Sequence, residues 1–369
     1  MMYANDPRIV MTLDAGGTNF VFSAMRGGQE IVKPLVLPAH ADGLERCLGQ
    51  LERGFMEIWR SLPERPVAIS FAFPGPADYP AGIIGDLPNF PSFRGGVALG
   101  PFLRELFGIP VFINNDGSLF AYGEALAGML PEVNERLRAS GSPKRFKNLI
   151  GVTLGTGFGA GVVIDGELLV GDNATGGSIW CFRNKRHPDY IVEESVSIRG
   201  VRYAYAERSG DTAVYTPREI FEIAEGLRPG NREAAIAAFA ELGEMAGDAL
   251  ASAVTLVDGL VVIGGGLSGA AKYFMPTLMR ELNASLGMLD GRKVGRLQMR
   301  AFDLDDAERF TAFAQGESVR LPVPGSVRMV DYDPCKRIGV AISKTGANRS
   351  IAMGAYVYAL RHLGKETLE

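Results

Sequence analysis

The stretch LDAGGTNFVFSAM, residues 13–25, places a glycine pair and a threonine between two apolar, strand-like segments. Adjacent glycines let the backbone turn its N–H groups toward an anion, and Thr18 adds a hydroxyl donor. Asp14 ends the first segment, where it can hold Mg²⁺ through water, because Mg²⁺ prefers few carboxylates and several waters. The pattern therefore favours a phosphate-binding loop, with an ordinary hairpin turn as the alternative.

Two further glycine-rich turns follow apolar segments. TLGTGFGAG, residues 153–161, has glycines at alternate positions, with hydroxyls at Thr153 and Thr156, and again suits a phosphate, although it lacks the lysine of a P-loop. A glycine-tolerant hairpin is the alternative there. VIGGGLS, residues 262–268, offers bare backbone that can pack against a nucleotide base or ribose. Taken alone, this third turn is better interpreted as a turn without a ligand.

The fourth element is Asn114-Asn115-Asp116-Gly117, at the end of a short apolar segment. A carboxylate beside two amides can accept the proton of a substrate hydroxyl while the amides orient that substrate, as phosphoryl transfer requires. Taken alone, the element is better explained as a turn that caps the following helix.

Around these turns, apolar strands alternate with segments of helical periodicity. Apolar residues recur with a helical period over residues 43–61, for example, and residues 67–73 form a short buried strand. Such alternation predicts an α/β architecture. The order strand, glycine loop, strand occurs twice, over residues 8–25 and 149–164, which suggests two related halves. The basic stretch 131–147 is expected to be an exposed connection.

The composition is that of a globular protein, with 369 residues, 22% charged residues and a net charge of −4. That balance gives no support for nucleic acid as a partner. The cysteines are far apart, so a reducing compartment is expected rather than a disulfide framework. No apolar run is long enough to cross a membrane, and the first residues lack a signal peptide pattern. We therefore expect a soluble, cytoplasmic protein.

Taken together, the motifs resemble the ROK family (repressors, open reading frames and kinases), within the sugar-kinase branch of the actin-like ATPase superfamily. The resemblance covers about residues 9–270 and the last helix. The matching stretches are LDAGGTNFVFSAM (13–25), FPGPADYPAGIIGDLPNFPSF (73–93), PVFINNDGSLFAYGE (110–124), VTLGTGFGAGVVIDGELLVG (152–171), VEESVS (192–197) and GLVVIGGGLSGA (259–270).

The resemblance implies two ribonuclease-H-like α/β lobes with a cleft between them. The first lobe would cover residues 1–117 and be joined by a C-terminal helix over 350–369. The second would cover 118–349, with a β-rich insertion at about 290–348. It also implies a kinase that uses ATP and Mg²⁺ to phosphorylate a hydroxyl of a hexose or amino sugar, and a homodimer.

The resemblance gives each matching residue an expected role. Asp116 would be the catalytic base and would bind the sugar together with Asn89, Asn115 and Glu193. The phosphates and Mg²⁺ of the nucleotide would lie against Asp14, Gly16, Gly17, Thr18, Gly155, Thr156 and Gly157, and its adenosine against Gly265 and Gly266.

The chain departs from the family pattern at residues 175–180. Gly177 stands where the family usually carries a sugar-binding glutamate, and Trp180 stands where it carries a histidine. The cysteine-rich zinc loop is missing and Cys181 is alone, so we expect no zinc. For Trp180, a buried packing role is favoured over stacking on a sugar.

These departures leave the substrate open: a sugar other than glucose, an amino sugar and weak catalysis all fit. A non-catalytic sensor of sugar or nucleotide is the alternative function, and nucleotide hydrolysis without a sugar is a third. A repressor is disfavoured because Asp14 leaves no room before it for a helix-turn-helix. The phosphate donor, ATP or polyphosphate, is not determined by the sequence.

Overall fold

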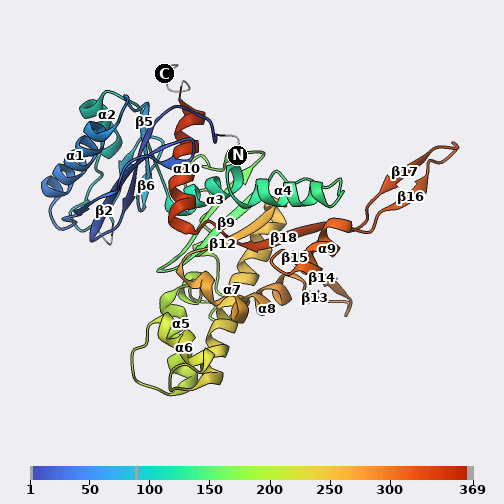
Figure 1. Ribbon diagram of the computed structural model, residues 1–369. Helices are drawn as coiled ribbons and strands as arrows, with labels where there is room; N and C mark the ends of the chain where they lie inside the picture. Colours follow the sequence, from blue (N-terminus) through green and yellow to red (C-terminus); the bar gives the residue numbers. More distant parts are fainter. Residues whose placement is uncertain (1–2, 88–89, 364–369) are drawn as a thin grey trace. The chain divides into compact units, whose positions relative to one another are not determined.

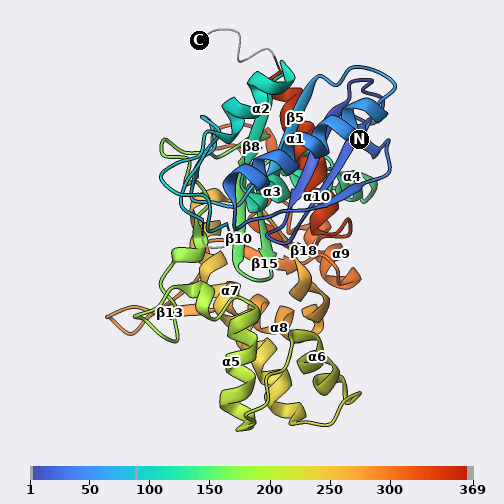
Figure 2. The same cartoon turned by 90° about the vertical axis from the view of Figure 1, so that its left-hand side faces the viewer.

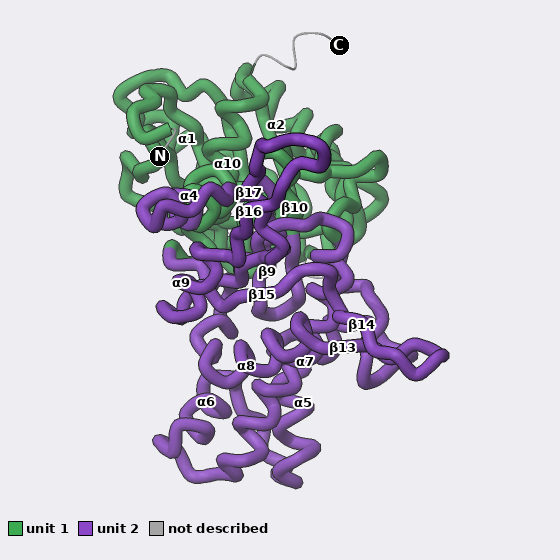
Figure 3. Tube along the Cα trace, turned by 90° about the vertical axis from the view of Figure 1, so that its right-hand side faces the viewer, with its two compact units in different colours: residues 1–131, 161–177, 345–369 green, residues 132–160, 178–344 purple. Residues whose placement is uncertain are grey.

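The computed structural model describes residues 3–87 and 90–363, and it divides into two compact units. Unit 1 comprises residues 1–131, 161–177 and 345–369, and unit 2 comprises residues 132–160 and 178–344 (Figure 3). Each unit combines a sheet with covering helices, which confirms the predicted α/β fold. The predicted lobe boundary after residue 117 and the cleft stay predictions.

Unit 1 is built on a sheet with the strand order β3-β2-β1-β5-β8, and β4 also pairs with β2. β1 runs antiparallel to β2 and parallel to β5, which in turn runs parallel to β8. The strands are β1 (Val10–Ala15), β2 (Asn19–Arg26), β3 (Gln29–Glu30), β4 (Leu35–Pro38), β5 (Ala68–Ala72) and β8 (Val111–Asn114). The short hairpin β6 (Ala77–Asp78) and β7 (Ile83–Ile84) lies apart from this sheet.

The register of these strands decides where the polar residues meet. Asp14 lies level with Ala72 in β5, and Ala72 lies level with Asn114 in β8. Because the three strands are parallel, their carboxyl ends share one edge of the sheet. Asp14 and the segment 114–117 therefore meet at that edge.

Helices cover both faces of the sheet in unit 1. α1 (Leu44–Ser61) and α2 (Leu99–Phe107) lie on one face, where a core rich in phenylalanine includes Phe22, Phe55 and Phe71 (Figure 1). α3 (Asp116–Leu126) and α10 (Ala347–His362) lie on the other. Strand β5 is buried along its whole length as a result.

Helices α3 and α10 approach each other backbone to backbone. A Cβ atom on Gly123 would lie 2.0 Å from the carbonyl oxygen of Ser350, and one on Gly354 would lie 1.9 Å from that of Leu119. The buried Ser350 hydroxyl also donates to Glu124 Oε1 at 2.6 Å. Glycine at these two positions is what permits so close an approach.

Unit 2 contains four parallel strands in the order β9-β12-β18-β15. These are β9 (Leu149–Leu154), β12 (Leu260–Gly264), β15 (Arg300–Asp303) and β18 (Arg337–Ile342). β10 (Phe158–Ile164) begins in unit 2, ends in unit 1 and pairs there with β11 (Glu167–Leu168).

Part of the helical layer of unit 2 is grouped around α7, the longest helix of that unit (Figure 2). α7 packs against α5, α6 and α8. The helices are α4 (Met129–Ala139, beginning in unit 1), α5 (Ile198–Ser209), α6 (Pro217–Glu225), α7 (Arg232–Val257), α8 (Ala271–Leu282) and α9 (Ala307–Gln315), with single turns η1 (Ile179–Cys181), η2 (Val192–Glu194) and η3 (Gly266–Ala270).

The segment 290–348, expected as a β-rich insertion, contains a helix and two strands of the main sheet as well as hairpin strands. β15 and β18 belong to the main sheet, and α9 connects them. Two hairpins project from this frame: β13 (Ser285–Gly287) with β14 (Lys293–Gly295), and β16 (Val319–Pro322) with β17 (Met329–Tyr332).

The expectation of an exposed connection over 131–147 was wrong for its first part, because α4 continues to Ala139. Arg136 lies over the Phe310 ring at 3.6 Å from its centre and donates to the Leu304 carbonyl, so it is not simply solvated. Among the described residues, no helix is long and apolar enough to span a membrane.

Candidate active site

One group of predicted site residues lies at the sheet edge of unit 1. Between β1 and β2, the Gly16 N–H donates to the Asn19 carbonyl at 3.0 Å, which closes a short loop. Gly16, Gly17 and Thr18 are exposed in this loop, and because the Gly16 N–H is used to close it, the backbone N–H groups of Gly17 and Thr18 are the ones that remain for an anion. Asp14 precedes the loop, and Asn348 Nδ2 lies 3.5 Å from its Oδ2.

Asp116 is the first residue of α3, directly after β8. The helix-capping role considered for this segment is filled by Asn115, whose Oδ1 accepts from the Gly117 N–H at 2.9 Å. Asp116 reaches the surface, but the protein around its carboxyl displaces water and raises its pKa, while N–H groups at the helix start partly oppose this.

The two acids of this edge influence each other. The pKa of Asp14 is raised, first by loss of water around its carboxyl and second by the negative charge of Asp116. Two carboxyl groups with raised pKa values at one sheet edge are typical of a functional site.

Tyr79 also belongs to this group in unit 1, and sequence reasoning missed it. Its hydroxyl donates to the Phe73 carbonyl at 3.0 Å and accepts from Asn115 Nδ2 at 3.4 Å. Burial raises the Tyr79 pKa to about 12, so the phenol stays neutral. It lies in the matched stretch 73–93, but no spacing in the sequence indicated that it would reach Asn115. Asn89, the other predicted sugar ligand of that stretch, lies outside the described residues.

A second group of predicted site residues lies at a sheet edge of unit 2. β9 and β12 are parallel neighbours, with Thr153 level with Gly264. The loop 155–157 and the turn 265–266 therefore leave the sheet side by side. A Cβ on Gly265, whose φ is +91°, would lie 2.4 Å from the Leu154 carbonyl oxygen, so only glycine fits this close approach. Thr156 and Gly266 complete the predicted residues that the structure brings together here.

Glu193 is held against the loop by both of its carboxyl oxygens. Oε2 accepts from the Phe158 N–H at 2.8 Å, and Oε1 pairs with Arg199 at 2.9 Å. A Cβ on Gly157 would lie 2.6 Å from Oε2, so this glycine makes room for the carboxylate. The structure thus joins Glu193 to the second glycine loop, as the predicted site requires.

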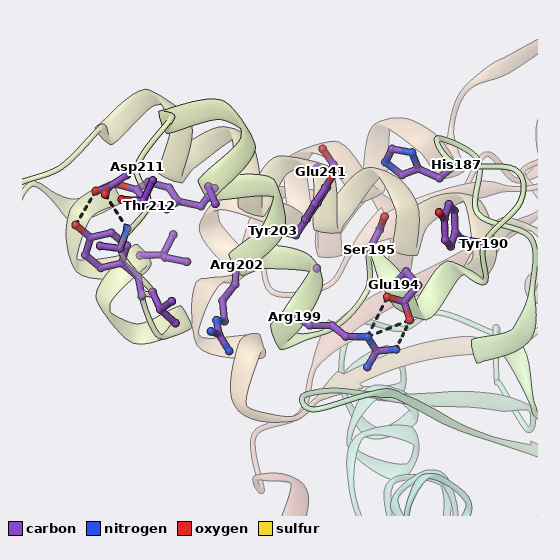
Figure 4. A pocket seen from close by; sticks show the side chains of 17 residues that line it. His187, Tyr190, Glu194, Ser195, Arg199, Arg202, Tyr203, Asp211, Thr212 and Glu241 are labelled. Atoms are coloured by element: carbon purple, nitrogen blue, oxygen red, sulfur yellow. Dashed lines mark hydrogen bonds and ion pairs between the residues drawn. The ribbon is translucent and has the colours of Figure 1, made fainter. Parts of the chain in front are cut away.

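Arg199 was not identified from the sequence. Its guanidinium contacts both oxygens of Glu194, from 2.8 to 3.2 Å (Figure 4). These contacts are in addition to the one with Glu193. Its Nη1 also lies 3.4 Å from the Thr156 carbonyl. These carboxylates raise the Arg199 pKa further. One side chain therefore connects the predicted sugar-binding glutamate with the predicted phosphate loop.

A cavity of about 930 Å³ starts at this cluster and follows α5 (Figure 4). Tyrosines form much of its wall, together with the buried Glu241, which is paired with Arg186 and Arg208. The cavity borders the Glu194 and Arg199 side of the cluster.

The two departures from the family pattern differ in character. Gly177 has a φ of +82°, a conformation that a glutamate would rarely adopt. Trp180 is 44% exposed in η1, so the expected buried packing role was wrong. Its neighbour Cys181 is an exposed free thiol. The part of the chain that the structure describes contains no group of three His, Cys, Asp or Glu side chains that could hold a metal.

Two mixed sheets covered by helices, with glycine loops at the carboxyl ends of their parallel strands, place this chain in the α/β class of folds. The family model of the ROK family matches residues 10–299, and the chain belongs to that family.

Solved structures agree with this assignment. A glucokinase from Parabacteroides distasonis is 73% identical, with a TM-score of 0.91 over 98% of this chain and 100% of that one. A ROK hexokinase from Thermus thermophilus shares the fold at 20% identity, with a TM-score of 0.66 over 96% of this chain and 99% of that one.

Curated relatives match over shorter lengths. A glucokinase from Thermotoga maritima is 28% identical over 45% of this chain and 48% of its own length. A glucokinase from Aeropyrum pernix is 35% identical over 44% of this chain and 45% of its own length. The chain spans about half the length of these curated relatives in the matched region.

Proposed function

We propose that the protein is an ATP-dependent sugar kinase that phosphorylates a hydroxyl of a hexose or amino sugar. The observation that carries the proposal is Asp116, a carboxyl with a raised pKa at the same sheet edge as Asp14 and the first glycine loop. The 73% identity with a glucokinase over nearly the whole chain supports this class of activity and makes glucose the first sugar to test.

In this proposal Asp116 is the general base. A sugar hydroxyl oxygen attacks the γ-phosphorus of ATP, its proton passes to the Asp116 carboxylate, and ADP leaves with the electrons of the broken P–O bond. A base whose pKa lies above that of an ordinary aspartate holds the proton better during transfer, and such general-base catalysis contributes about 10²–10⁴-fold.

Sugar binding is assigned to Asn89, Asn115, Asp116 and Glu193. Asn115 is supported by its fixed orientation, because its amide bonds both Tyr79 and the start of α3. Glu193 is supported by its fixed carboxylate, which the Phe158 N–H and Arg199 hold in one position. Such preorganised groups bind a polyol without ordering themselves first.

The nucleotide is assigned to the glycine turns of both units, with phosphates at 16–18 and 155–157 and adenosine at 265–266. Mg²⁺ fits Asp14, since a hard cation prefers carboxylate oxygen and would relieve the repulsion that Asp116 exerts on this carboxyl. When bound with ATP, the ion neutralises the charge that develops on the transferred phosphoryl group.

The second candidate is a sensor that binds sugar or nucleotide without turnover. It is favoured by one observation: Gly177 and the exposed Trp180 occupy the positions of the family's usual glutamate and histidine. Two sugar-binding groups are then missing, which lowers the affinity for a sugar while Asp116 is retained.

The experiment is a panel of hexoses and amino sugars with Mg-ATP, in which ADP release and sugar binding are both measured. We expect sugar-dependent ADP release, with glucose or an amino sugar as the preferred substrate. Polyphosphate in place of ATP tests the donor. Sugar binding without any ADP release, in protein that also binds ATP, would replace the kinase proposal with the sensor.

A further inference from the structure

The cavity of about 930 Å³ beside α5, the α5 cavity, has no role in the proposed phosphoryl transfer (Figure 4). All of its lining residues belong to unit 2, and they include Arg199 but neither Asp116 nor Glu193. Sites for small ligands usually measure about 300–1,000 Å³. The α5 cavity is near the upper end of that range, so it has the size for a ligand with more than one ring.

Two tyrosines of this cavity present their rings to solvent. Tyr190 and Tyr203 are each 62% exposed, and they come from separate elements, the loop before η2 and helix α5. His187 packs edge-on against Tyr190, with ring centres 6.3 Å apart, which restricts the movement of that ring. Exposed aromatic rings gathered at one concave surface, rather than scattered singly, mark a contact site for a ligand. The cavity therefore offers flat apolar surfaces at two places along its wall.

The wall of the α5 cavity also contains a buried carboxylate with one unused oxygen. Glu241 in α7 is 7% exposed, and Arg186 and Arg208 both bind its Oε2. Among the residues that the structure describes, none bonds to Glu241 Oε1. Because two arginines already compensate the charge of Glu241, this carboxylate does not need a cation. Its remaining oxygen is an acceptor that suits the hydroxyl group of a ligand.

Ser195 supplies the complementary group in the same wall. It is also 7% exposed, and its Oγ accepts from Asn184 Nδ2 at 2.8 Å. No residue of the described part of the chain accepts from the Ser195 hydroxyl in return, so its O–H remains as a donor. Buried donors and acceptors are costly to leave unpaired. A ligand that carries hydroxyl groups, which both donate and accept, satisfies Ser195 and Glu241 together.

The other charged groups of this wall are largely compensated within the protein. Arg199 binds Glu194, and Asp211 accepts from the Tyr215 hydroxyl at 2.8 Å. Arg202 on α5 is exposed, and no described residue pairs with its guanidinium. One unpaired arginine beside compensated acids offers donors to neutral oxygens without making the wall strongly positive. The charge balance thus favours a neutral ligand over a polyanion or a cation.

We infer that the α5 cavity binds a neutral oligosaccharide, at a site separate from the sugar-binding residues of the proposed function. Its sugar rings lie against Tyr190 and Tyr203. Its hydroxyl groups bond to Glu241 Oε1, to the Ser195 hydroxyl and to Arg202. Sugar rings carry apolar C–H faces that pack on aromatic rings and hydroxyl groups around their edges, so they match a wall that combines exposed tyrosines with a few buried polar groups.

This inference does not depend on the proposed kinase activity, because binding is measured without ATP. The first test presents the full chain to an array of neutral oligosaccharides that covers glucans, mannans, xylans, galactans and chitin fragments. The strongest binder is then titrated into the protein by calorimetry. We expect at least one fragment of three or more sugar units to bind with a Kd of about 1 mM or tighter.

Three tyrosine variants locate the binding. Tyr203→Ala removes one aromatic surface and should weaken binding by about tenfold, as expected for truncation of an aromatic anchor. Tyr203→Phe keeps the ring and loses only the hydroxyl, so it should bind within about threefold of the parent. Tyr332→Ala is the matched control, because it removes an exposed tyrosine of β17 outside the cavity and should bind as the parent does. Since both tyrosines are exposed, all three variants should keep the melting temperature of the parent.

A competition separates this site from the predicted sugar site. Asp116→Asn should bind the oligosaccharide with the affinity of the parent, and an excess of glucose should not displace it. Displacement by glucose, or loss of binding in Asp116→Asn, would place the ligand at the predicted sugar site and overturn the inference. Equal binding by Tyr203→Ala and its parent would overturn it as well. So would an array without any bound oligosaccharide, which is the result expected if a second copy or another protein covers the cavity.

Discussion

The acids that belong to the predicted site are held in different surroundings in the two units. In unit 1, Asp14 and Asp116 have raised pKa values because they have lost water and, for Asp14, because Asp116 is near. In unit 2, Glu193 accepts one backbone hydrogen bond and one from Arg199. A carboxylate that is compensated this well is a fixed binding group, whereas an acid with a raised pKa is ready to take up a proton.

Under the proposed function, this difference assigns chemistry to unit 1 and positioning to unit 2. Both units use the same backbone arrangement, a glycine loop at the carboxyl end of a parallel strand. What separates them is the electrostatic environment of the acid next to the loop. Variants that alter one environment at a time can test this division.

The largest effect is expected from Asp116→Asn. Loss of the general base should lower kcat by about 10²-fold or more, with little change in the KM for ATP. The amide cannot carry the unfavourable charge, so thermal unfolding should occur at the same or a higher temperature at neutral pH. A variant that keeps more than a tenth of the parent kcat would remove Asp116 from the role of base.

The pH profile should show the next largest effect. Asp116 must be ionised to accept a proton, and its pKa is raised above the ordinary aspartate value of 3.8. The kcat/KM should therefore fall as the pH is lowered through that raised pKa, about tenfold for each pH unit below it. The residual activity of Asp116→Asn should lack this acid limb, and a shared limb would point to another group.

A smaller effect is expected from Arg199→Ala. Its contacts with Glu193 are partly exposed, and exposed ion pairs contribute about 1 kcal/mol at most, so KM for the sugar should rise by up to about fivefold. The kcat should change less than KM. Arg199→Lys keeps the charge but not the forked geometry, so its KM for the sugar should lie between those of the parent and Arg199→Ala. A loss confined to kcat would show that Arg199 acts on the reacting atoms instead.

The smallest effect is expected from Trp180→Phe. The side chain is exposed and its replacement keeps an aromatic face. Activity should therefore change less than twofold, and the melting temperature should change by only about a degree or two. Trp180→Ala distinguishes stacking from mere exposure, since only a stacking role raises the KM for the sugar further.

Much of this arrangement could be predicted from the sequence because it depends on local rules. Asp14 and Asp116 each follow an apolar strand, and parallel strands bring such residues to one edge. The misses have a different origin. Arg199 and Tyr79 reach the site through side-chain contacts that no local spacing reveals.

Helix α4 and Trp180 show that the exposure of a side chain is also hard to predict from the sequence. The charged stretch around Arg136 looks solvated, yet it is helical, and its guanidinium packs on a phenylalanine that follows it in the chain by more than a hundred residues. Trp180 is apolar and was expected inside, but exposure of a single large residue is decided by the path of a short turn.

The contact of α3 with α10 through Gly123 and Gly354 sets an order of events during synthesis. The helix that begins with Asp116 is made early, but the helix that packs on it is made only when residues 347–362 are added. At about 5–20 residues per second, the wait is on the order of 10–50 s. A nascent chain that ends before residue 347 thus presents Asp116 on a helix whose glycine-lined face α10 does not yet cover.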